Sequence, residues 1–259
     1  MSTVTFADLV RGVRRHRVMG CNVSVLRSVD STNALARRVR AELAEDDLPL
    51  PWSALLAFEQ TAGRGRRGRT WESPAGLGIY ATVFGRLRER ERLQVLPLAV
   101  AAALAEGLEP FAPTVRLKWP NDLMLGGRKV GGVLVESMPG TSGDMDALIG
   151  FGVNHGQPLA LLPAPGATSL AAEGFTPALP DVACALLAAV GAELTSSEPV
   201  ERTVERWLAR TQHRSGDVLR CRVPDGEVTG RYLGLTEGGL LRLDVDGHER
   251  HLASGEVEA

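Results

Sequence analysis

The closely spaced turns in the C-terminal part of the chain restrict its possible folds more than any other feature of the sequence. After Gln212, four short β-like runs are separated by Asp-Gly, Glu-Gly-Gly and Asp-Gly turns: residues 217–223, 227–235, 239–245 and 248–254. Short alternating runs between such turns are typical of a small β-barrel or sandwich. We therefore place a domain boundary near residue 212, with a small β domain at 212–259 and a larger domain at 1–211.

The larger domain mixes strands with helices. Strands are predicted at 22–29, 53–59, 77–84, 115–118, 129–137 and 146–154, and helices at 92–109, 180–194 and 199–210. A further helix follows Ser31, which can cap it, with Leu35, Val39 and Leu43 as its apolar face. The fold class is therefore α+β: a mixed β-sheet with flanking helices, then a small all-β domain.

Two connecting segments are also predicted. Gly126 and Gly127 form a tight turn after residues 122–125, because paired glycines favour such turns. Residues 155–180 are rich in Pro, Ala and Gly, which predicts a loop with one short helix.

Composition excludes several classes of protein. The formal net charge of -2 gives no global attraction to nucleic acid or membrane. No apolar run approaches the roughly 20 residues that span a bilayer, and residues 1–29 do not resemble a secretory signal. The three cysteines, Cys21, Cys184 and Cys221, have no zinc or disulfide spacing, which predicts a cytoplasmic protein. Cys184 is expected to be a small buried apolar residue.

A run of glycine and arginine between Gln60 and Arg69 is the strongest single motif. Three glycines alternate with four arginines: Gly63, Gly65, Gly68, Arg64, Arg66, Arg67 and Arg69. Glycines let backbone N–H groups approach a ligand, and guanidinium groups bind phosphate or carboxylate. We expect a mobile loop that orders around a polyanion. By itself, such a run favours a solvated surface loop or an RNA-binding segment, and it lacks the Gly-Lys-Ser/Thr ending of a Walker loop.

Three further segments put polar groups at strand ends. They are Lys-Trp-Pro-Asn-Asp at 118–122, Lys-Val-Gly-Gly-Val-Leu-Val-Glu at 129–136 and Gly-Phe-Gly-Val-Asn at 150–154. The first is as compatible with an ordinary turn around a packed Trp119, and the glycine pair of the second with a bulge. Lys118 and Lys129 are the only lysines among 29 basic residues, and both lie in these segments.

Together with Asp-Ser-Thr-Asn at 30–33, these motifs resemble those of biotin protein ligases in order and spacing. The resemblance covers essentially residues 25–259. It implies a catalytic domain of the class II aminoacyl-tRNA synthetase-like, biotin/lipoate ligase type, followed by an SH3-like β-barrel. It also implies a monofunctional enzyme, because the motif at residue 31 leaves too little chain for the winged-helix repressor domain of other members.

The implied activity joins biotin to ATP as biotinyl-5′-AMP, with release of pyrophosphate, and transfers biotin to a lysine of a biotin carboxyl carrier domain. Mg²⁺ is expected with ATP, from ligands that the sequence does not identify. The resemblance implies that Lys129 lies between the biotin carboxylate and the α-phosphate and that Arg66 helps to retain the adenylate. Asp122 falls in the motif near which the acceptor lysine should arrive, and its assistance to that amine is a hypothesis. These three are the candidate catalytic residues.

The remaining site residues follow from the same resemblance. Candidate biotin contacts are Ser31, Thr32, Asn33, Gln60, Arg64, Gly65, Arg66, Trp71 and Lys129. Candidate ATP and phosphate contacts are Arg64, Arg66, Arg67, Arg69, Lys118, Asn121 and Asn154. Phe175 is the one candidate for stacking on adenine, and His155 stands where an apolar residue is expected.

Several alternatives stay open at this point. A lipoate ligase is the nearest, although the arginine loop and residues 118–122 favour biotin. A nucleic-acid-binding protein would depend on the arginine loop alone. The arginines at 11, 14, 15 and 17 are expected to form a solvated helix face rather than to read DNA, so no specific DNA partner and no membrane partner are expected. A homodimer is compatible with the sequence.

Overall fold

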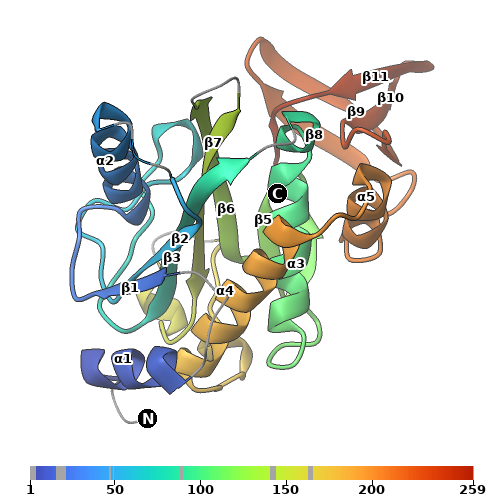
Figure 1. The fold of residues 1–259 in the computed structure, drawn as a ribbon. Coiled ribbons are helices and arrows are strands. Elements are labelled where there is room, and N and C mark those ends of the chain that lie inside the picture. The colour runs from blue at the N-terminus through green and yellow to red at the C-terminus, as the bar shows by residue number, and fades with distance from the viewer. Residues whose placement is uncertain are drawn as a thin grey trace.

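The computed structural model describes residues 4–15, 22–46, 48, 50–87, 90–140, 144–162 and 166–258 (Figure 1). Arg11 and Arg14 are exposed on the first helix, as expected. The expectations for Arg17, Cys21 and the side chain of Arg15 concern groups outside the described part.

A seven-stranded mixed sheet forms the centre of the molecule. Its spatial order is β1 (Asn22–Leu26), β2 (Ser53–Ala57), β3 (Gly78–Leu87), β7 (Met145–Asn154), β6 (Arg128–Pro139), β5 (Asp122–Leu125) and β4 (Arg116–Lys118). Only β1 and β2 pair in parallel; the other neighbours are antiparallel. The long central strands β3, β7 and β6 therefore place distant parts of the sequence in fixed register.

Helices cover both faces of this sheet (Figure 1). They are α1 (Phe6–Arg15), α2 (Thr32–Glu45), α3 (Leu96–Leu108), α4 (Leu179–Thr195) and α5 (Val200–Leu208). Short 3₁₀ turns are η1 (Arg66–Gly68), η2 (Arg90–Leu93), η4 (Leu159–Leu161) and η5 (Ala171–Glu173).

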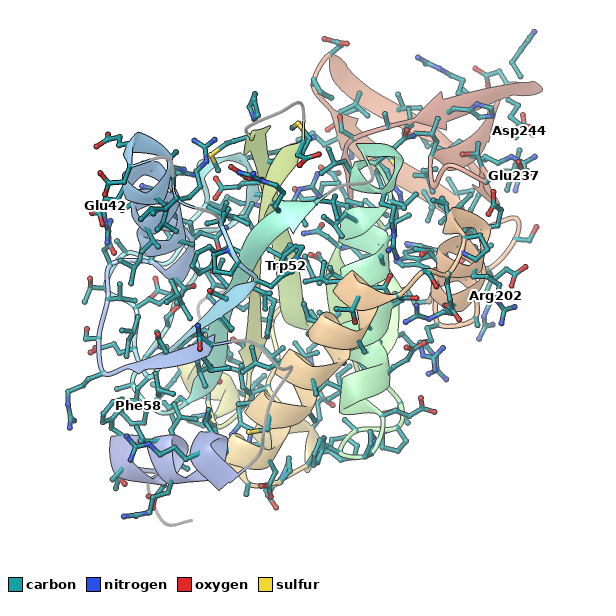
Figure 2. All side chains as sticks on the ribbon, in the orientation of Figure 1. Glu42, Trp52, Phe58, Arg202, Glu237 and Asp244 are labelled. Atoms are coloured by element: carbon teal, nitrogen blue, oxygen red, sulfur yellow. The ribbon has the colours of Figure 1, made fainter. Side chains whose placement is uncertain are left out.

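Alternation along the strands assigns the two faces. In β7, Ile149 belongs to the large core that also contains the residues of α3 and α4, whereas Leu148 belongs to a smaller cluster with Leu35 and Val39 of α2. Successive side chains of a strand point to opposite faces, so α2 packs on one face and α3 and α4 on the other. Helix α1 packs on α4, and Phe58 lies beside it, in edge contact with Phe6 (Figure 2).

A separate five-stranded antiparallel sheet follows at the C-terminal end, next to α3 and α5 (Figure 1). Its order is β11 (His248–Leu252), β10 (Leu241–Val245), β9 (Gly226–Leu235), β8 (Val218–Val223) and β12 (Glu256–Val257). Side chains such as Glu237 and Asp244 point outward from it (Figure 2). Its inner positions, including Cys221, Leu241 and Leu243, are fully buried.

The α+β class and the sequence of helices and strands are confirmed, with three differences. Residues 122–125 form the strand β5 rather than the approach to a turn, and Leu123 and Leu125 are buried in it. In the segment predicted as a loop with one helix, the described residues between 155 and 178 form two 3₁₀ turns. The two-residue strand β12 was not predicted, because it exists only through pairing with β8.

Two smaller expectations also have clear outcomes. Cys184 is buried in α4, as predicted, and burial raises the pKa of its thiol to about 11. Within the described residues, the structure contains no helix long and apolar enough to cross a membrane.

Candidate active site

A cavity of about 240 Å³ opens on the sheet face that carries α2. Its lining comes from the N-terminus of α2, the arginine loop, and strands β6 and β7. The sequence-predicted residues that line it are Ser31, Thr32, Asn33, Gln60, Arg64, Gly65, Arg66, Arg69, Trp71, Asn121, Lys129 and Asn154. The fold therefore brings most of the predicted site residues to one cavity.

Glycines form the floor of this cavity. Gly150 pairs with Thr82 and Leu134, and Gly152 pairs with Gly132, across three adjacent strands. A Cβ atom on Gly150 would lie 2.0 Å from Asn33 Oδ1, and one on Gly152 would lie 2.5 Å from Trp71 Nε1. Both glycines are required because side chains above the sheet occupy the space of a Cβ atom.

The N-terminus of α2 brings a dense set of hydrogen-bonding groups to one end of the cavity. Ser31 caps the helix and accepts from the backbone N–H of Ala34 at 3.5 Å. Ser31, Thr32 and Asn33 are all buried. A helix start is suited to this role because its first N–H groups have no partner within the helix.

Gln60 connects this helix to the loop. Its Oε1 accepts from the backbone N–H of Thr32 at 2.8 Å, and its Nε2 donates to Ser73 Oγ at 2.8 Å. Gly63 packs closely on the Trp71 carbonyl oxygen, since a Cβ atom at position 63 would lie only 2.3 Å from it. The start of the arginine loop is therefore tightly held.

The arginine loop folds back on itself around η1. The Gly65 N–H donates to the Arg69 carbonyl at 2.7 Å, and the Trp71 N–H donates to the Gly63 carbonyl at 2.9 Å. Arg67 sits at the tip with a positive φ of 56°. This return places Arg64, Arg66 and Arg69 along the cavity.

Arg66 points inward from the loop and donates to Asn121 Oδ1 at 2.7 Å. Burial, followed by the charge of Arg67, lowers the pKa of Arg66. Among the described residues, neither Arg64 nor Arg66 forms an ion pair with a carboxylate. A partly buried guanidinium without an ion-paired carboxylate, such as that of Arg66, is suited to an anionic ligand.

Two arginines of the loop reach the C-terminal sheet instead. Arg69 Nη1 donates to Glu256 Oε1 at 2.7 Å, and both Nη atoms of Arg67 lie 3.4 Å from the Arg222 carbonyl. Although burial opposes it, the hydrogen bond from Arg69 holds the pKa of Glu256 below its usual value. Arg67 does not line the cavity, whereas Arg69 both lines it and pairs with Glu256.

Lys129 enters the cavity from β6. Its Nζ lies 2.5 Å from Asp122 Oδ1 and 5.7 Å from the centre of the Trp71 ring. Asp122 is only 8% exposed, so its charge is shielded from solvent and directed at Lys129. The ring of Trp71 covers the ammonium on another side, an arrangement that favours a cation.

The segment 118–122 shapes the neighbouring wall. Asn121 donates to the Val133 carbonyl at 2.5 Å, and the Trp119–Pro120 peptide is cis. Lys118 lies outside the cavity lining, and its positive charge contributes to a lowered pKa of His213. Asn121 therefore belongs to the site, while Lys118 stands beside it.

The far end of the cavity is closed by the segment after residue 165. Its backbone brackets Lys129: the Lys129 N–H donates to the Gly166 carbonyl, and the Thr168 N–H to the Lys129 carbonyl, each at 2.8 Å. Asn154 Nδ2 donates to the Thr168 carbonyl at 2.9 Å. Phe175 packs against the main core and is absent from the cavity lining.

His155 packs outside the cavity. Its Nε2 lies 2.9 Å from the Pro177 carbonyl, and burial lowers its pKa. A polar residue is therefore accommodated at this position by one backbone acceptor.

Four residues of the site were not among the candidates, although Glu136 ends the motif at 129–136. Ser73, Thr82, Glu136 and Glu256 bond to predicted site residues from distant positions. Only the register of the strands and the packing of the C-terminal sheet bring them there. Within the described residues, no group of three or more His, Cys, Asp or Glu side chains could hold a metal ion by itself.

The site thus combines buried hydrogen-bonding groups at one end with cations at the other. The Biotin/lipoate A/B protein ligase family matches residues 25–154, which contain all the catalytic residues and all the biotin and phosphate contacts predicted from the sequence. This chain belongs to that family.

Relatives and solved structures of the biotin/lipoate ligase family agree over most of the chain. A Biotin--[acetyl-CoA-carboxylase] ligase of Paracoccus denitrificans is 34% identical, over 90% of this chain and 98% of the relative. The Bifunctional ligase/repressor BirA of Escherichia coli is 33% identical, over 92% of this chain and 74% of the relative. The structure of the Aquifex aeolicus biotin protein ligase in complex with biotin and ATP has a TM-score of 0.72 and 27% identity, covering 92% of this chain and 97% of that chain.

Proposed function

We infer that this chain is an ATP-dependent biotin protein ligase. Its substrates are biotin, ATP and a biotin carboxyl carrier domain of a biotin-dependent carboxylase. The observation that carries this inference is that one cavity has both a neutral hydrogen-bonding end and a cationic end. Family membership and the relatives named for biotin ligation support biotin over lipoate.

The two ends of the cavity suit the two parts of biotin. The ureido ring has two N–H donors and one carbonyl acceptor, which match hydroxyl and amide groups such as those of Ser31, Thr32 and Gln60. The carboxylate of biotin is an anion, which matches Lys129. Trp71 and the glycines Gly150 and Gly152 also line this cavity, and the indole of Trp71 packs directly on Gly152.

The first step joins two anions. A carboxylate oxygen of biotin attacks the α-phosphorus of ATP, the bond between the α-phosphorus and its bridging oxygen breaks, and pyrophosphate leaves. Lys129 and the loop arginines lower the repulsion between carboxylate and triphosphate, and this electrostatic stabilisation is usually the largest catalytic contribution. Arg64, Arg66 and Arg69 are proposed phosphate contacts, with Arg67 closer to the C-terminal sheet.

The second step releases AMP. The amine of the carrier lysine attacks the acyl carbon, an amide forms, and the amine loses one proton. We propose that Asp122 assists this amine and that the loop, by covering the adenylate, keeps water from the anhydride. Asn121 and Asn154 are proposed to hold the nucleotide, and Lys118 to lie near the approach of the acceptor.

Mg²⁺ is proposed to enter as its complex with ATP. This ion is commonly held through substrate phosphates and water, with few protein carboxylates. Asp122 is already engaged with Lys129, and the described residues offer no metal-binding cluster of their own. This donor set fits an ion carried by the nucleotide.

A boundary near residue 212 between the catalytic and C-terminal domains is also part of the proposal.

Pyrophosphate release from Mg-ATP tests the first step, with biotin or lipoate as the acid. The wild type should release pyrophosphate with biotin only, and Lys129→Ala should lower the rate by about 10²–10³-fold. Arg242→Ala is the matched control, because it removes one positive charge from the exposed face of the C-terminal sheet. Release with lipoate alone would assign the lipoate branch, and no release with either acid would refute the ligase.

A further inference from the structure

The side-chain amide of Asn33, a residue of the cavity lining, has both of its ends engaged in hydrogen bonds. Its Nδ2 donates to Glu136 Oε2 at 3.0 Å, and Glu136 is itself paired with Arg37. The carboxylate of Glu136 can only accept, so the NH₂ group of Asn33 must face it. Asn33 Oδ1 therefore points the other way, toward Thr82.

Thr82 is fully buried on β3 and lies between two oxygens. Its Oγ1 is 2.6 Å from Asn33 Oδ1 and 2.8 Å from Thr32 Oγ1. A hydroxyl has one proton, and an amide oxygen cannot donate. The proton of Thr82 must therefore go to Asn33, and the contact with Thr32 requires the proton of Thr32.

The hydroxyl of Thr32 is left with no proton to donate to a ligand. Its proton is used in the 2.8 Å contact with Thr82, which is shorter than its 3.2 Å contact with Gln60 Oε1. Gln60 Oε1 already accepts from the Thr32 backbone N–H. Thr32 is one of the residues that line the cavity, and its hydroxyl oxygen is then available to a ligand only as an acceptor.

We propose that Glu136 and Thr82 are positioning residues that set the hydrogen-bond polarity of the cavity, so that Thr32 accepts from a ligand N–H. Neither residue needs to touch the ligand. Hydrogen bonds are donated from Thr32 to Thr82, from Thr82 to Asn33, and from Asn33 to Glu136. The carboxylate of Glu136 fixes the direction of every hydrogen bond in this series.

This proposal rests on the proposed function, because it assigns a role to one ureido N–H of biotin. An analogue of biotin with oxygen in place of this ureido N–H would bring a lone pair of that oxygen against a lone pair of the Thr32 hydroxyl. The pocket would then reject the analogue more strongly than the loss of one hydrogen bond alone requires.

Calorimetric binding tests this polarity, with biotin and two cyclic carbamate analogues in which one or the other ureido N–H is replaced by oxygen. In Thr82→Val, Thr32 is released from Thr82 and can donate to the new oxygen. The ratio of the analogue Kd to the biotin Kd should then fall about 10-fold for one analogue. Thr82→Ser keeps the hydroxyl and should retain the wild-type ratio.

Glu136 provides a second pair of variants. Glu136→Gln can still present an oxygen to Asn33 and should keep the wild-type ratio. Glu136→Leu removes the acceptor, lets the Asn33 amide turn, and should lower the ratio as Thr82→Val does. Thr203→Val, a buried change on α5, is the control for loss of a buried hydroxyl, and thermal melting of each variant verifies that it folds.

The outcomes separate the two proposals. An unchanged ratio in both Thr82→Val and Glu136→Leu, with biotin still bound, would overturn the polarity proposal alone. A wild-type protein that binds no biotin would overturn the proposed function and this inference with it. A lowered ratio in Thr82→Ser would show that packing, and not the proton, sets the preference.

Discussion

The ammonium of Lys129 lies 2.5 Å from the carboxylate of Asp122, at the edge of the cavity. The two residues come from adjacent antiparallel strands, β6 and β5. We propose that the cation of this pair acts in the first step and that its carboxylate accepts a proton from the amine in the second. One contact therefore links residues proposed for different steps.

Asp122→Asn should separate these two steps. The substitution keeps the shape of the side chain and leaves Lys129 free to neutralise phosphate, so pyrophosphate release should change by less than about 10-fold. Transfer to the carrier should fall by about 10²-fold, since a proton acceptor is lost. Single-turnover transfer from preformed biotinyl-5′-AMP measures the second step directly. Equal losses in both steps would assign Asp122 only to the placement of Lys129.

Alanine substitutions at Gly132 and at Gly131 should have different effects on activity and stability. A Cβ on Gly132 would lie 3.3 Å from Lys129 Cε and 3.4 Å from its Nζ, so Gly132→Ala should displace the lysine. We expect pyrophosphate release to fall about 10-fold, while the free energy of unfolding changes by less than about 1 kcal/mol.

Gly131→Ala is the matched variant. Its Cβ would lie 2.8 Å from the carbonyl oxygen of Gly152, which belongs to the backbone and cannot turn aside. We expect a loss of stability of about 1–3 kcal/mol. Urea denaturation and the rate of pyrophosphate release, measured on both variants, check the contrast. Similar stability losses in the two would contradict it.

Arg66→Ala should make the enzyme release its intermediate. Arg66 reaches inward and donates to Asn121, and both line the cavity, so its loss should open the side of the site that we propose covers the adenylate. Free biotinyl-5′-AMP, measured by chromatography during turnover without carrier, should rise at least about 10-fold. Arg67→Ala is the control, because Arg67 contacts the Arg222 carbonyl outside the cavity. Equal release by both variants would attribute retention to the loop as a whole.

The motifs of the site could be predicted from the sequence because each is local. Ser31 caps a helix that begins one residue later, and the glycines alternate with arginines in one loop. Such features depend on neighbours in the chain. Their convergence on one cavity also follows from the family resemblance, which places all of them in one catalytic domain.

The supporting residues could not be predicted, since strand register creates their contacts. Thr82 meets Asn33 only because β3 and β7 place Thr82 opposite Gly150, where a side chain would strike the Asn33 amide. Glu256 meets Arg69 across 187 positions of sequence, through a two-residue strand. Strand β5 was missed because Pro120 and Gly126 surround only four strand residues, which resemble a turn.

His213 should make the stability of the protein depend on pH. It accepts from the Trp119 N–H at 3.4 Å, and burial, followed by the charge of Lys118, lowers its pKa to about 4 from 6.5. Between these values the unfolded chain binds more protons than the folded one, so stability rises with pH from about 4 to 6.5 and then levels off. Moving from pH 7 to pH 5 should cost about 2 kcal/mol from this residue.

Urea unfolding of the wild type and His213→Gln at both pH values measures this contribution. Glutamine can still accept from Trp119 but does not titrate, so its loss of stability should be smaller by about 2 kcal/mol. Some dependence should persist in the variant, because burial also lowers the pKa of His155 and gives it the same sign. Identical losses in the two proteins would mean that His213 is as easily protonated in the folded chain as in the unfolded one.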